Sequence, residues 1–483
     1  MIVELLGYLP DHDPTVVGVL TDCSGVVPTF RGMAGAPAPE AASIATLAAT
    51  CVGSALLTLL DGTTRIFAGT ATNLYETGSS TWTDVSRAAT YTTGTSGRWR
   101  FAQQENVSFA ANGADTLQAS VSSGAFSCVA GAPIANIVEA VGKFVFGVNT
   151  ATATNQIAWA ALGDYTDWVT SVATQAGSDT VTETPGGITA FRRFGITAIL
   201  YKRNSMYLGT NVGPPNIWQF DLIPGVAGAL SQEVVVNIGT PENPKHIFMG
   251  EDNFYVYDGS KPIPIADDSV RNSVFDFIQK SRDYACTAMH DANNSRVYFW
   301  YPTTDSDIPD KCVVYHYKKN RWGRDDRSVE AVTEFSSSFV TYDALGALYP
   351  TYADFPSATY DAAFAGSSQI FPAIFDTSHI LQTMTGASAT SSITTGDYGD
   401  DQIFTTLNSI RPRFLVSPTS ATMTNYYKQN EGDSLTTGTV TTLSSRNTFD
   451  VIREARWHRL KMSFVGDWEM AGFSPVWEKG GLE

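Results

Sequence analysis

Short runs of β-branched and aromatic residues, separated by Gly, Asn and Asp, fill most of this 483-residue chain. Such runs favour strands, because these side chains suit a pleated, half-buried surface. Convincing helical stretches are few, and the best is 269–283, where Val270, Val274 and Ile278 give an approximate apolar stripe. The sequence therefore predicts an all-β fold. The clearest strand-like runs are 107–111, 143–148, 196–201, 254–257 and 296–300.

The strand-like runs recur at an approximately regular interval. Phe109 and Phe146 are 37 residues apart, and Phe254 and Tyr298 are 44 apart. These intervals are close to the length of one four-stranded propeller blade. Radial repetition would also protect the edges that so many short strands create. We therefore predict a β-propeller body over residues 61–365.

Several of the repeated units end in a turn that carries a tryptophan. Trp82 follows Ser-Thr, Trp168 closes a Tyr-Thr-Asp-Trp run, and Trp322 follows Asn-Arg. We interpret these residues as blade closers. The alternative is that they form an aromatic binding box.

The amino-acid composition of the sequence changes near residue 366. A stretch rich in Ser, Thr and Gly precedes a second β region from 403 to about 476. In that region Leu460, Met462 and Phe464 alternate with polar residues, which predicts a half-buried strand. We expect residues 366–483 to form a C-terminal β-sandwich-like or platform region with assembly contacts. Residues 1–60 are expected to pack on the propeller or to complete it.

Charge is scarce and unevenly distributed. Charged residues make up 16% of the chain, against about 25% in a typical domain, and the formal net charge is -17. Residues 1–64 carry a net charge of -5 and residues 411–461 a net charge of +4. Opposite signs at the two ends would suit contacts between subunits; a solvated basic strand face is the alternative. The candidate interface residues are Arg411, Arg413, Arg453, Arg456, Arg459 and Lys461.

The same acidic balance makes a sequence-reading nucleic-acid binder improbable, because phosphate contacts need clustered Lys and Arg. Residues 41–60 are uncharged and long enough to span a bilayer. Their Ser, Thr and Gly content and the flanking Glu40 and Asp61 instead favour a buried pair of strands or a strand and turn. The first ten residues also lack the basic residues of a secretory signal. We expect neither a stable membrane span nor a signal peptide.

Residue types that carry chemistry are dispersed. The cysteines have no CxxC spacing, the histidines stand singly, and P-loop and GxSxG motifs are absent. We therefore predict buried reduced thiols, and no catalytic residue, metal or cofactor. The cysteines are Cys23, Cys51, Cys128, Cys286 and Cys312. The histidines are His12, His246, His290, His316, His379 and His458.

One acidic loop is a candidate site for a metal ion. Asp305, Asp307 and Asp310 could present carboxylates to Ca²⁺. The loop lacks the Gly and the distal Glu of an EF-hand, so we favour a solvated hairpin tip.

A second acidic loop contains Asp397, Asp400 and Asp401. Paired carboxylates cleave glycosidic bonds, but Asp and Gly clusters are also ordinary turn residues. We favour the turn interpretation.

An ordered series of short segments resembles a known family. The segments are FAGTATNLY at 67–75, TWTDVS at 81–86, GRWRFAQ at 97–103, AANG at 110–113, AALGDYTDW at 160–168, VGPP at 212–215, FYVYDG at 254–259, ARWHR at 455–459 and AGF at 471–473. In this order they resemble the tail nozzle or tail-hub proteins of short-tailed bacteriophages, also called packaged DNA stabilisation proteins. Residues 366–402 match no segment of that family, and the first 60 match weakly.

The resemblance implies a non-enzymatic structural protein of the virion tail, assembled in the host cytoplasm. It implies a homohexameric ring below the head-to-tail adaptor, with tail fibres or spikes and a plug protein as further partners. Genomic double-stranded DNA would leave through the ring without sequence readout, and an acidic lumen would limit its binding. The alternative function is a propeller-type tail protein that binds or cleaves host glycans.

Overall fold

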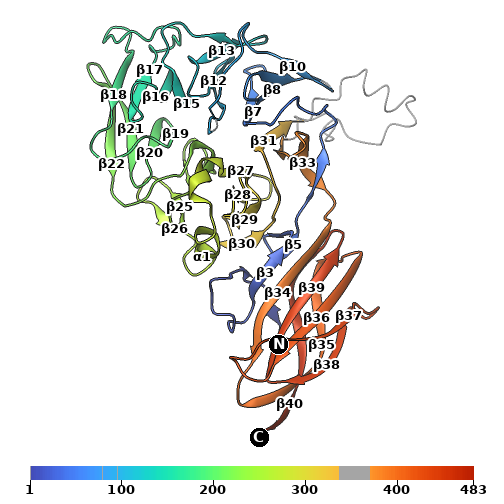
Figure 1. Ribbon diagram of the computed structural model, residues 1–483. Coiled ribbons are helices and arrows are strands. Elements are labelled where there is room, and N and C mark those ends of the chain that lie inside the picture. Colours follow the sequence, from blue (N-terminus) through green and yellow to red (C-terminus); the bar gives the residue numbers. More distant parts are fainter. Residues whose placement is uncertain (1, 79, 95, 337–369, 483) are drawn as a thin grey trace.

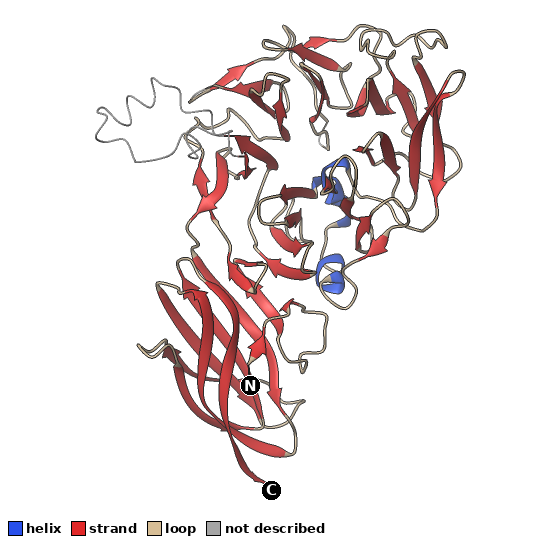
Figure 2. Cartoon of the chain, turned by 180° about the vertical axis from the view of Figure 1, so that it is seen from behind, coloured by secondary structure: helices blue, strands red, loops and turns tan. Residues whose placement is uncertain are grey.

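The computed structural model describes residues 2–78, 80–94, 96–336 and 370–482 (Figure 1). A ring of antiparallel blades forms one body, and a layered β region projects from one side of the ring (Figure 2). The prediction of an all-β propeller with an additional C-terminal β region is confirmed. No helix in the described ranges is long and apolar enough to cross a membrane.

The propeller has seven four-stranded blades. Blade 1 consists of β7 (Gly53–Thr58), β8 (Thr64–Gly69), β9 (Leu74–Thr77) and β10 (Trp82–Asp84). Blade 2 consists of β11 (Arg100–Gln104), β12 (Val107–Ala111), β13 (Gln118–Val121) and β14 (Ser127–Cys128). Blade 3 consists of β15 (Ala135–Val141), β16 (Phe144–Thr150), β17 (Gln156–Trp159) and β18 (Gly177–Thr180).

The next three blades follow in chain order. Blade 4 consists of β19 (Ala190–Phe194), β20 (Thr197–Tyr201), β21 (Met206–Gly213) and β22 (Ile217–Ile223). The 3₁₀ turn η1 (Gln232–Val234) leads into blade 5, which consists of β23 (Val235–Asn237), β24 (His246–Met249), β25 (Phe254–Tyr257) and β26 (Ile263–Pro264). Blade 6 consists of β27 (Thr287–Asp291), β28 (Arg296–Tyr301), β29 (Lys311–His316) and β30 (Arg321–Arg324).

Blade 7 closes the ring with a strand from the other end of the chain. It consists of β31 (Ala331–Ser336), β32 (Ile370–Phe375), β33 (Leu381–Gly386) and β6 (Ala38–Ala41). In the β6–β33 pair, Glu40 lies opposite Thr383 and Ala41 opposite Gln382. The inner strand β31 packs beside β7 of blade 1, so the first strands of all seven blades form a continuous ring around the axis.

The C-terminal β region is a sandwich of two sheets. One sheet has the order β2-β3-β34-β39-β36-β37. Its strands are β2 (Gly7–Tyr8), β3 (Val19–Ser24), β34 (Thr390–Gly399), β39 (Trp457–Val465), β36 (Ser420–Lys428) and β37 (Thr436–Thr442). The other sheet contains β4 (Val26–Pro28), β5 (Met33–Gly35), β40 (Glu469–Leu482), β35 (Ile403–Val416) and β38 (Phe449–Ala455), with β1 (Val3–Glu4) paired to β40.

The second sheet of the sandwich is continuous with blade 6. Strand β30 pairs with β4, β4 with β5, and β5 with β40, which gives one ten-stranded sheet across both bodies. Hydrogen bonds of the backbone therefore cross the junction, in addition to side-chain packing. The propeller and the sandwich are joined as one continuous β structure.

The boundaries of the propeller differ from the predicted 61–365. Strands β6 and β7 come from the segment 1–60, and β32 and β33 lie beyond residue 365. The remaining N-terminal strands, β1 to β5, belong to the sandwich sheets or to the junction. Local sequence pattern predicts a strand but not its partner, and β6 pairs with β33, which lies more than 300 residues away along the chain.

The buried face of the sandwich agrees with the alternation in the sequence. Leu460, Met462 and Phe464 on β39 are fully buried, whereas Arg459 and Lys461 are half-buried. They face Leu407 and Ile410 of β35 and other apolar residues in the common core. The predicted half-buried strand is confirmed.

The tryptophans of the predicted blade ends pack against other parts of the ring. The ring centre of Trp82 lies 5.8 Å from that of Phe375, a contact that joins blades 1 and 7, and the indole N–H of Trp82 donates to the carbonyl of Ala45. Trp322 is buried against Phe254 of blade 5 at 5.2 Å. The indole of Trp168 donates to the nearby carbonyl of Tyr165. The three residues are dispersed around the ring and do not converge on one binding box.

The predicted helix over 269–283 is wrong in its length. The structure has a short helix, α1 (Arg271–Phe275), and a separate 3₁₀ segment, η2 (Lys280–Ala285). Gln279 between them has an extended backbone, and its N–H donates to the carbonyl of Pro302. A tertiary hydrogen bond therefore replaces the helical one at this position.

Replacing Ala42 with Pro tests the closure of the ring. The N–H of Ala42 donates to the carbonyl of Leu381 at 3.0 Å, directly after β6. Proline removes this donor, so we expect a loss of about 1–3 kcal/mol in the free energy of unfolding. Denaturant unfolding measures the loss, and Ala42→Ser, which keeps the N–H, is the matched control. Equal stability of the two variants would contradict this account of the closure.

Candidate functional site

The six predicted interface residues lie on both sheets of the sandwich. Arg411 and Arg413 are on β35 and Arg453 is on β38, in the sheet shared with blade 6. Arg459 and Lys461 are on β39 in the facing sheet, and Arg456 lies in the turn between β38 and β39. They therefore do not form one patch, and their environments differ.

Arg459 is held in a buried ion pair. Its Nε lies 2.7 Å from one carboxylate oxygen of Asp397, and Nζ of Lys428 lies 3.0 Å from the other. The Asp397 side chain is only 4% exposed. Lys428 also donates to the carbonyl of Glu431. This cluster connects β34, β36 and β39 inside one sheet. Arg459 therefore has a structural role in the fold.

Two further arginines of the set lie over aromatic rings. The guanidinium of Arg453 is 4.7 Å from the ring centre of Tyr427, and that of Arg456 is 4.7 Å from the ring centre of Phe404. Cation–π contacts of this kind stabilise the pair by about 0.5–1 kcal/mol at exposed sites. Arg411 and Arg413 are the exposed members of the set.

Five of the six carboxylates of the two acidic loops have structural partners, and Asp305 is exposed. Asp310 accepts from the N–H and the hydroxyl of Thr303, and Asp307 pairs with Arg282 at 3.2 Å. In the other loop, Asp400 accepts from the backbone of 402 and 403, and Asp401 accepts from the indole of Trp457. In the described part of the chain, no group of three His, Cys, Asp or Glu side chains is placed to hold a metal.

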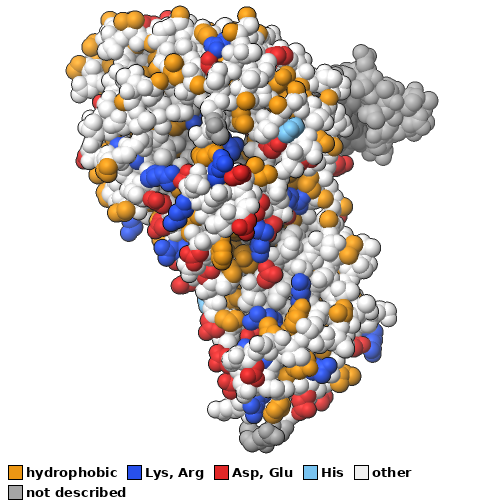
Figure 3. Space-filling model, viewed as in Figure 1, with side chains coloured by type: hydrophobic (Ala, Val, Ile, Leu, Met, Phe, Trp, Pro, Cys, Tyr) orange, Lys and Arg blue, Asp and Glu red, His pale blue; other side chains and the backbone are white. Residues whose placement is uncertain are grey.

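The axis of the propeller contains a polar cavity of about 480 Å³. The inner strands of six blades line it, and Figure 3 shows Lys and Arg side chains gathered near the centre of the ring. Arg100 forms an ion pair with Glu233 at 2.8 Å, and Arg192 lies 3.6 Å from Glu139. A cavity of this volume has the size of a small-molecule site and cannot pass a DNA duplex.

The charges along this axis are largely compensated. Burial raises the pKa of Glu139, which Arg192 partly offsets. Burial also tends to raise the pKa of Glu233, but the guanidinium of Arg100 outweighs it and the pKa is lowered. Burial raises the pKa of Glu334. This lining was not predicted from the sequence, although RWR at 98–100 and RR at 192–193 within strand-like runs are unusual enough to indicate it.

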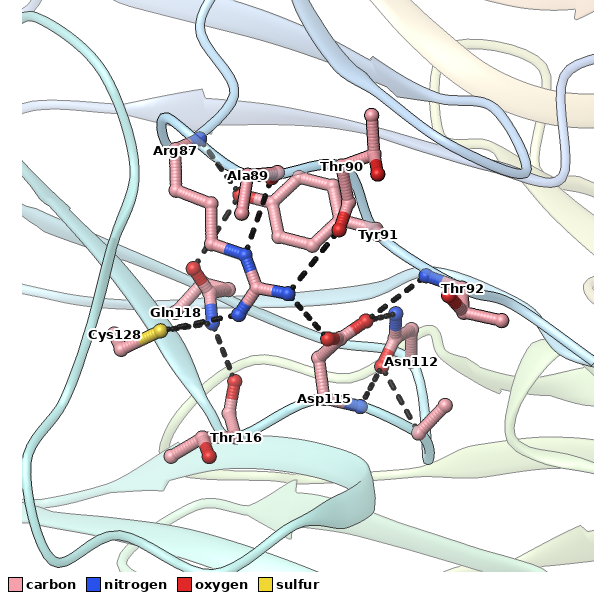
Figure 4. Close-up of polar contacts among 11 residues, drawn as sticks. Arg87, Ala89, Thr90, Tyr91, Thr92, Asn112, Asp115, Thr116, Gln118 and Cys128 are labelled. Carbon is pink, nitrogen blue, oxygen red and sulfur yellow. Dashed lines mark hydrogen bonds and ion pairs between the residues drawn. The ribbon is translucent and has the colours of Figure 1, made fainter.

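A polar cluster on blade 2 surrounds an exposed cysteine (Figure 4). The sulfur of Cys128 accepts from the amide of Gln118 at 3.3 Å and from the guanidinium of Arg87 at 3.2 Å. Arg87 in turn pairs with Asp115 and lies over the ring of Tyr91. The hydrogen bond from Gln118 and the neighbouring Arg87 lower the pKa of the Cys128 thiol.

The other four cysteines have the opposite environment. Cys23, Cys51, Cys286 and Cys312 are buried, and burial raises the pKa of each thiol, to about 12 for Cys51. The expectation of buried thiols is therefore correct for these four and wrong for Cys128. Sequence spacing could not distinguish them, because Arg87 lies 41 residues from Cys128 along the chain.

No family model and no curated protein matches the sequence. Among solved structures, YCF48 bound to D1 peptide is similar over 60% of this chain and 87% of its own, with 12% identity and a TM-score of 0.34. BBS1N in complex with ARL6DN is similar over 72% and 96%, with 10% identity and a TM-score of 0.38. The extracellular domain of the putative one component system BT4673 from B. thetaiotaomicron is similar over 84% and 46%, with 10% identity and a TM-score of 0.42.

Asp397→Asn tests the buried ion pair. The substitution leaves two partly buried cations without their counter-charge, so we expect a loss of about 3–5 kcal/mol in the free energy of unfolding. Asp400→Asn is the control, because residue 400 is exposed and asparagine can still accept from the backbone. Denaturant unfolding of both variants measures the difference. If Asp397→Asn is no less stable than Asp400→Asn, the pair does not stabilise the sandwich.

Alkylation with iodoacetamide tests the environment of Cys128. Because its pKa is lowered and its sulfur is exposed, we expect it to react before the four buried thiols and to retain reactivity at a lower pH than an ordinary cysteine. Arg87→Gln should slow the reaction severalfold, whereas Arg31→Gln in the distant sandwich should not change it. Peptide mass spectrometry gives the rates. Equal rates in both variants would contradict the role of Arg87.

Proposed function

We propose that this chain is the structural subunit of a tail nozzle in a short-tailed bacteriophage. In this proposal six copies form a ring below a head-to-tail adaptor, with fibres or spikes at its side and a plug that retains the genome. The ordered sequence segments described above are the observation that carries the proposal. They extend from blade 1, through blades 2 to 5, to strands β38 to β40 of the sandwich.

The construction of the chain supports a mechanical role. A ten-stranded sheet runs from blade 6 into the sandwich, and the N-terminal strands are divided between the two bodies. Bending the junction would break backbone hydrogen bonds inside this sheet as well as side-chain contacts. A subunit that must hold its place in a ring while DNA leaves under pressure benefits from such stiffness.

In this proposal the conduit lies between copies and not within one propeller. About 480 Å³ within one propeller is far too little for a duplex, so DNA would pass through the lumen that the ring encloses. The formal charge of -17 per copy gives the assembly a strong acid excess. Such a surface repels phosphates and lacks the counterion release that makes basic proteins bind DNA.

The same proposal assigns no catalytic role to the chain. The alternative of glycan cleavage depends on paired carboxylates that are free to act. Asp397, one of the three carboxylates considered for that alternative, is enclosed by Lys428 and Arg459. No observation in the described residues favours that function over the nozzle.

Electron microscopy and mass photometry of the purified full chain test the proposal. We expect six-fold rings, formed by the chain alone or after addition of the adaptor encoded with it. We also expect no retention of duplex DNA at physiological salt, because the net charge is strongly negative. A chain that stays monomeric in both conditions, or binds duplex DNA tightly with a steep salt dependence, would overturn the proposal.

A further inference from the structure

A second cavity of about 480 Å³ lies where the propeller meets the sandwich, and we call it the junction cavity. Blade 6 forms one wall, through the turn between β27 and β28, the start of β28 and the end of β29. The sandwich forms the other wall, through the β4–β5 hairpin and the turn between β39 and β40. A cavity of this volume has the size of a small-molecule site. One chain contains both walls.

Arg296 on the blade 6 wall is a buried cation without a counter-charge. The residue is 7% exposed and lines the junction cavity. Among the described residues it forms no ion pair, and its one hydrogen bond runs from Nε to the carbonyl of Pro28 at 2.7 Å. Asp291 lies opposite Arg296 in the β27–β28 pair, but its carboxylate accepts from the backbone N–H and the side-chain amide of Asn294. Because buried charges in proteins are normally paired, the terminal nitrogens of Arg296 point to an anion in the cavity.

His316 lies directly opposite Arg296 in the β28–β29 pair and lines the same cavity. It is 2% exposed, and its Nδ1 has no hydrogen-bond partner in the part of the chain that the structure describes. Burial and the neighbouring cations Arg296, Arg321 and Lys318 lower the pKa of His316. The imidazole is therefore neutral near pH 7 and has one N–H to donate.

Lys318 adds an exposed ammonium group to the blade 6 wall. This wall therefore offers the guanidinium of Arg296, an imidazole N–H of His316 and the ammonium of Lys318. Arginine and lysine are the side chains that most often bind phosphate oxygens, arginine through its planar fork and lysine as a point charge. The blade 6 wall has the donors of a phosphate site.

The acidic side chains of the junction cavity lie on the sandwich wall. Asp467 is exposed, and one of its carboxylate oxygens accepts from the N–H of Ser388 at 2.6 Å. Glu469 accepts from the hydroxyl of Thr29 at 2.9 Å and lies 3.5 Å from Arg31. The lining charges therefore balance in number, but the cations and the carboxylates occupy different walls. Carboxylate oxygens accept from hydroxyl groups, so this wall suits a ligand that carries hydroxyls.

Phe30 on the β4–β5 hairpin gives the cavity an aromatic ring that is 63% exposed. Nζ of Lys319 lies 3.8 Å from the centre of this ring, which adds a further cation beside the cavity. Ligand sites commonly combine an aromatic surface with a few placed polar groups. Phe30 supplies apolar contact area for the ring of a ligand.

We propose that the junction cavity binds a small phosphorylated sugar. Its phosphate contacts Arg296, His316 and Lys318, and its hydroxyl groups donate to Asp467 and Glu469. A simple inorganic anion would leave the two carboxylates without donors, and a neutral sugar would leave Arg296 without a counter-charge. This inference goes beyond the nozzle proposal and does not depend on it, because the whole cavity lies within one copy.

Isothermal titration calorimetry of the full chain tests the ligand class. The probes are the phosphate monoesters of ribose and glucose, the two unphosphorylated sugars and inorganic phosphate. We expect at least one sugar phosphate to bind about tenfold or more tightly than its parent sugar and than inorganic phosphate. The same ligand should raise the Tm, because it binds only the folded chain. Inorganic phosphate that binds as tightly as both sugar phosphates would overturn the sugar assignment, and failure of both sugar phosphates to bind would overturn the site.

Substitutions on the blade 6 wall test the phosphate contact. Lys318→Gln leaves the fold unchanged, because residue 318 is exposed, and should weaken sugar phosphate binding severalfold. Lys143→Gln is the matched control, since it removes the same charge from an exposed turn of blade 3 and should not change binding. Arg296→Lys keeps the charge but loses the planar fork, so we expect a loss of about tenfold in affinity. Equal affinities of the Lys318 and Lys143 variants would overturn the phosphate contact.

Asp467→Asn tests the sandwich wall. Asparagine can still accept from the N–H of Ser388, so the fold should be retained. We expect weaker binding of the sugar phosphate and unchanged or tighter binding of inorganic phosphate, because only the sugar donates hydroxyls to this wall. An unchanged affinity for the sugar phosphate would contradict the role of Asp467. Ring assembly is a separate readout, so this inference and the nozzle proposal can fail independently.

Discussion

The pairing of β6 with β33 is the contact on which the rest of the fold depends. A propeller has no stable end, because an unclosed first or last blade exposes a sheet edge and one face of its neighbour. Here a four-residue strand, Ala38–Ala41, completes blade 7, and β31 then packs beside β7. Closing a loop of some 340 residues costs only slightly more conformational entropy than closing a shorter loop, because the cost of closure grows with the logarithm of loop length. The gain is a ring with seven mutually supporting blades.

The same N-terminal segment also determines how the two bodies are joined. Before reaching β6 the chain supplies β1 to β5 to the sandwich and to its link with blade 6. Closure of the ring and attachment of the sandwich are therefore consequences of one stretch of about forty residues. A disturbance of this stretch would affect both bodies together, which is the behaviour expected of a single mechanical unit.

Buried and exposed charged side chains contribute differently to this fold. Inside, Asp397 is matched by Lys428 and Arg459, and Glu233 by Arg100, because an unpaired buried charge is strongly unfavourable. Outside, Arg446 lies 3.7 Å from Asp450, and both side chains are more than half exposed. Water and salt screen such an exposed pair, so it stabilises the fold much less than a buried pair does.

The local sequence pattern was sufficient to predict the class of fold, because strand alternation and blade-length spacing depend on neighbouring residues. Leu460, Met462 and Phe464 are buried as their period of two requires. Pattern was insufficient where distant segments meet. The number of blades, the closure by β6 and the ion pair of Arg459 with Asp397 depend on pairings between segments far apart along the chain, and many short strands have equivalent local signals. The basic residues of 411–461 illustrate the limit, because their sequence shows only an excess of charge. The tertiary structure separates Arg459, which is half-buried and paired with Asp397, from Arg411, which is exposed, because burial is set by the strands that pack around each residue.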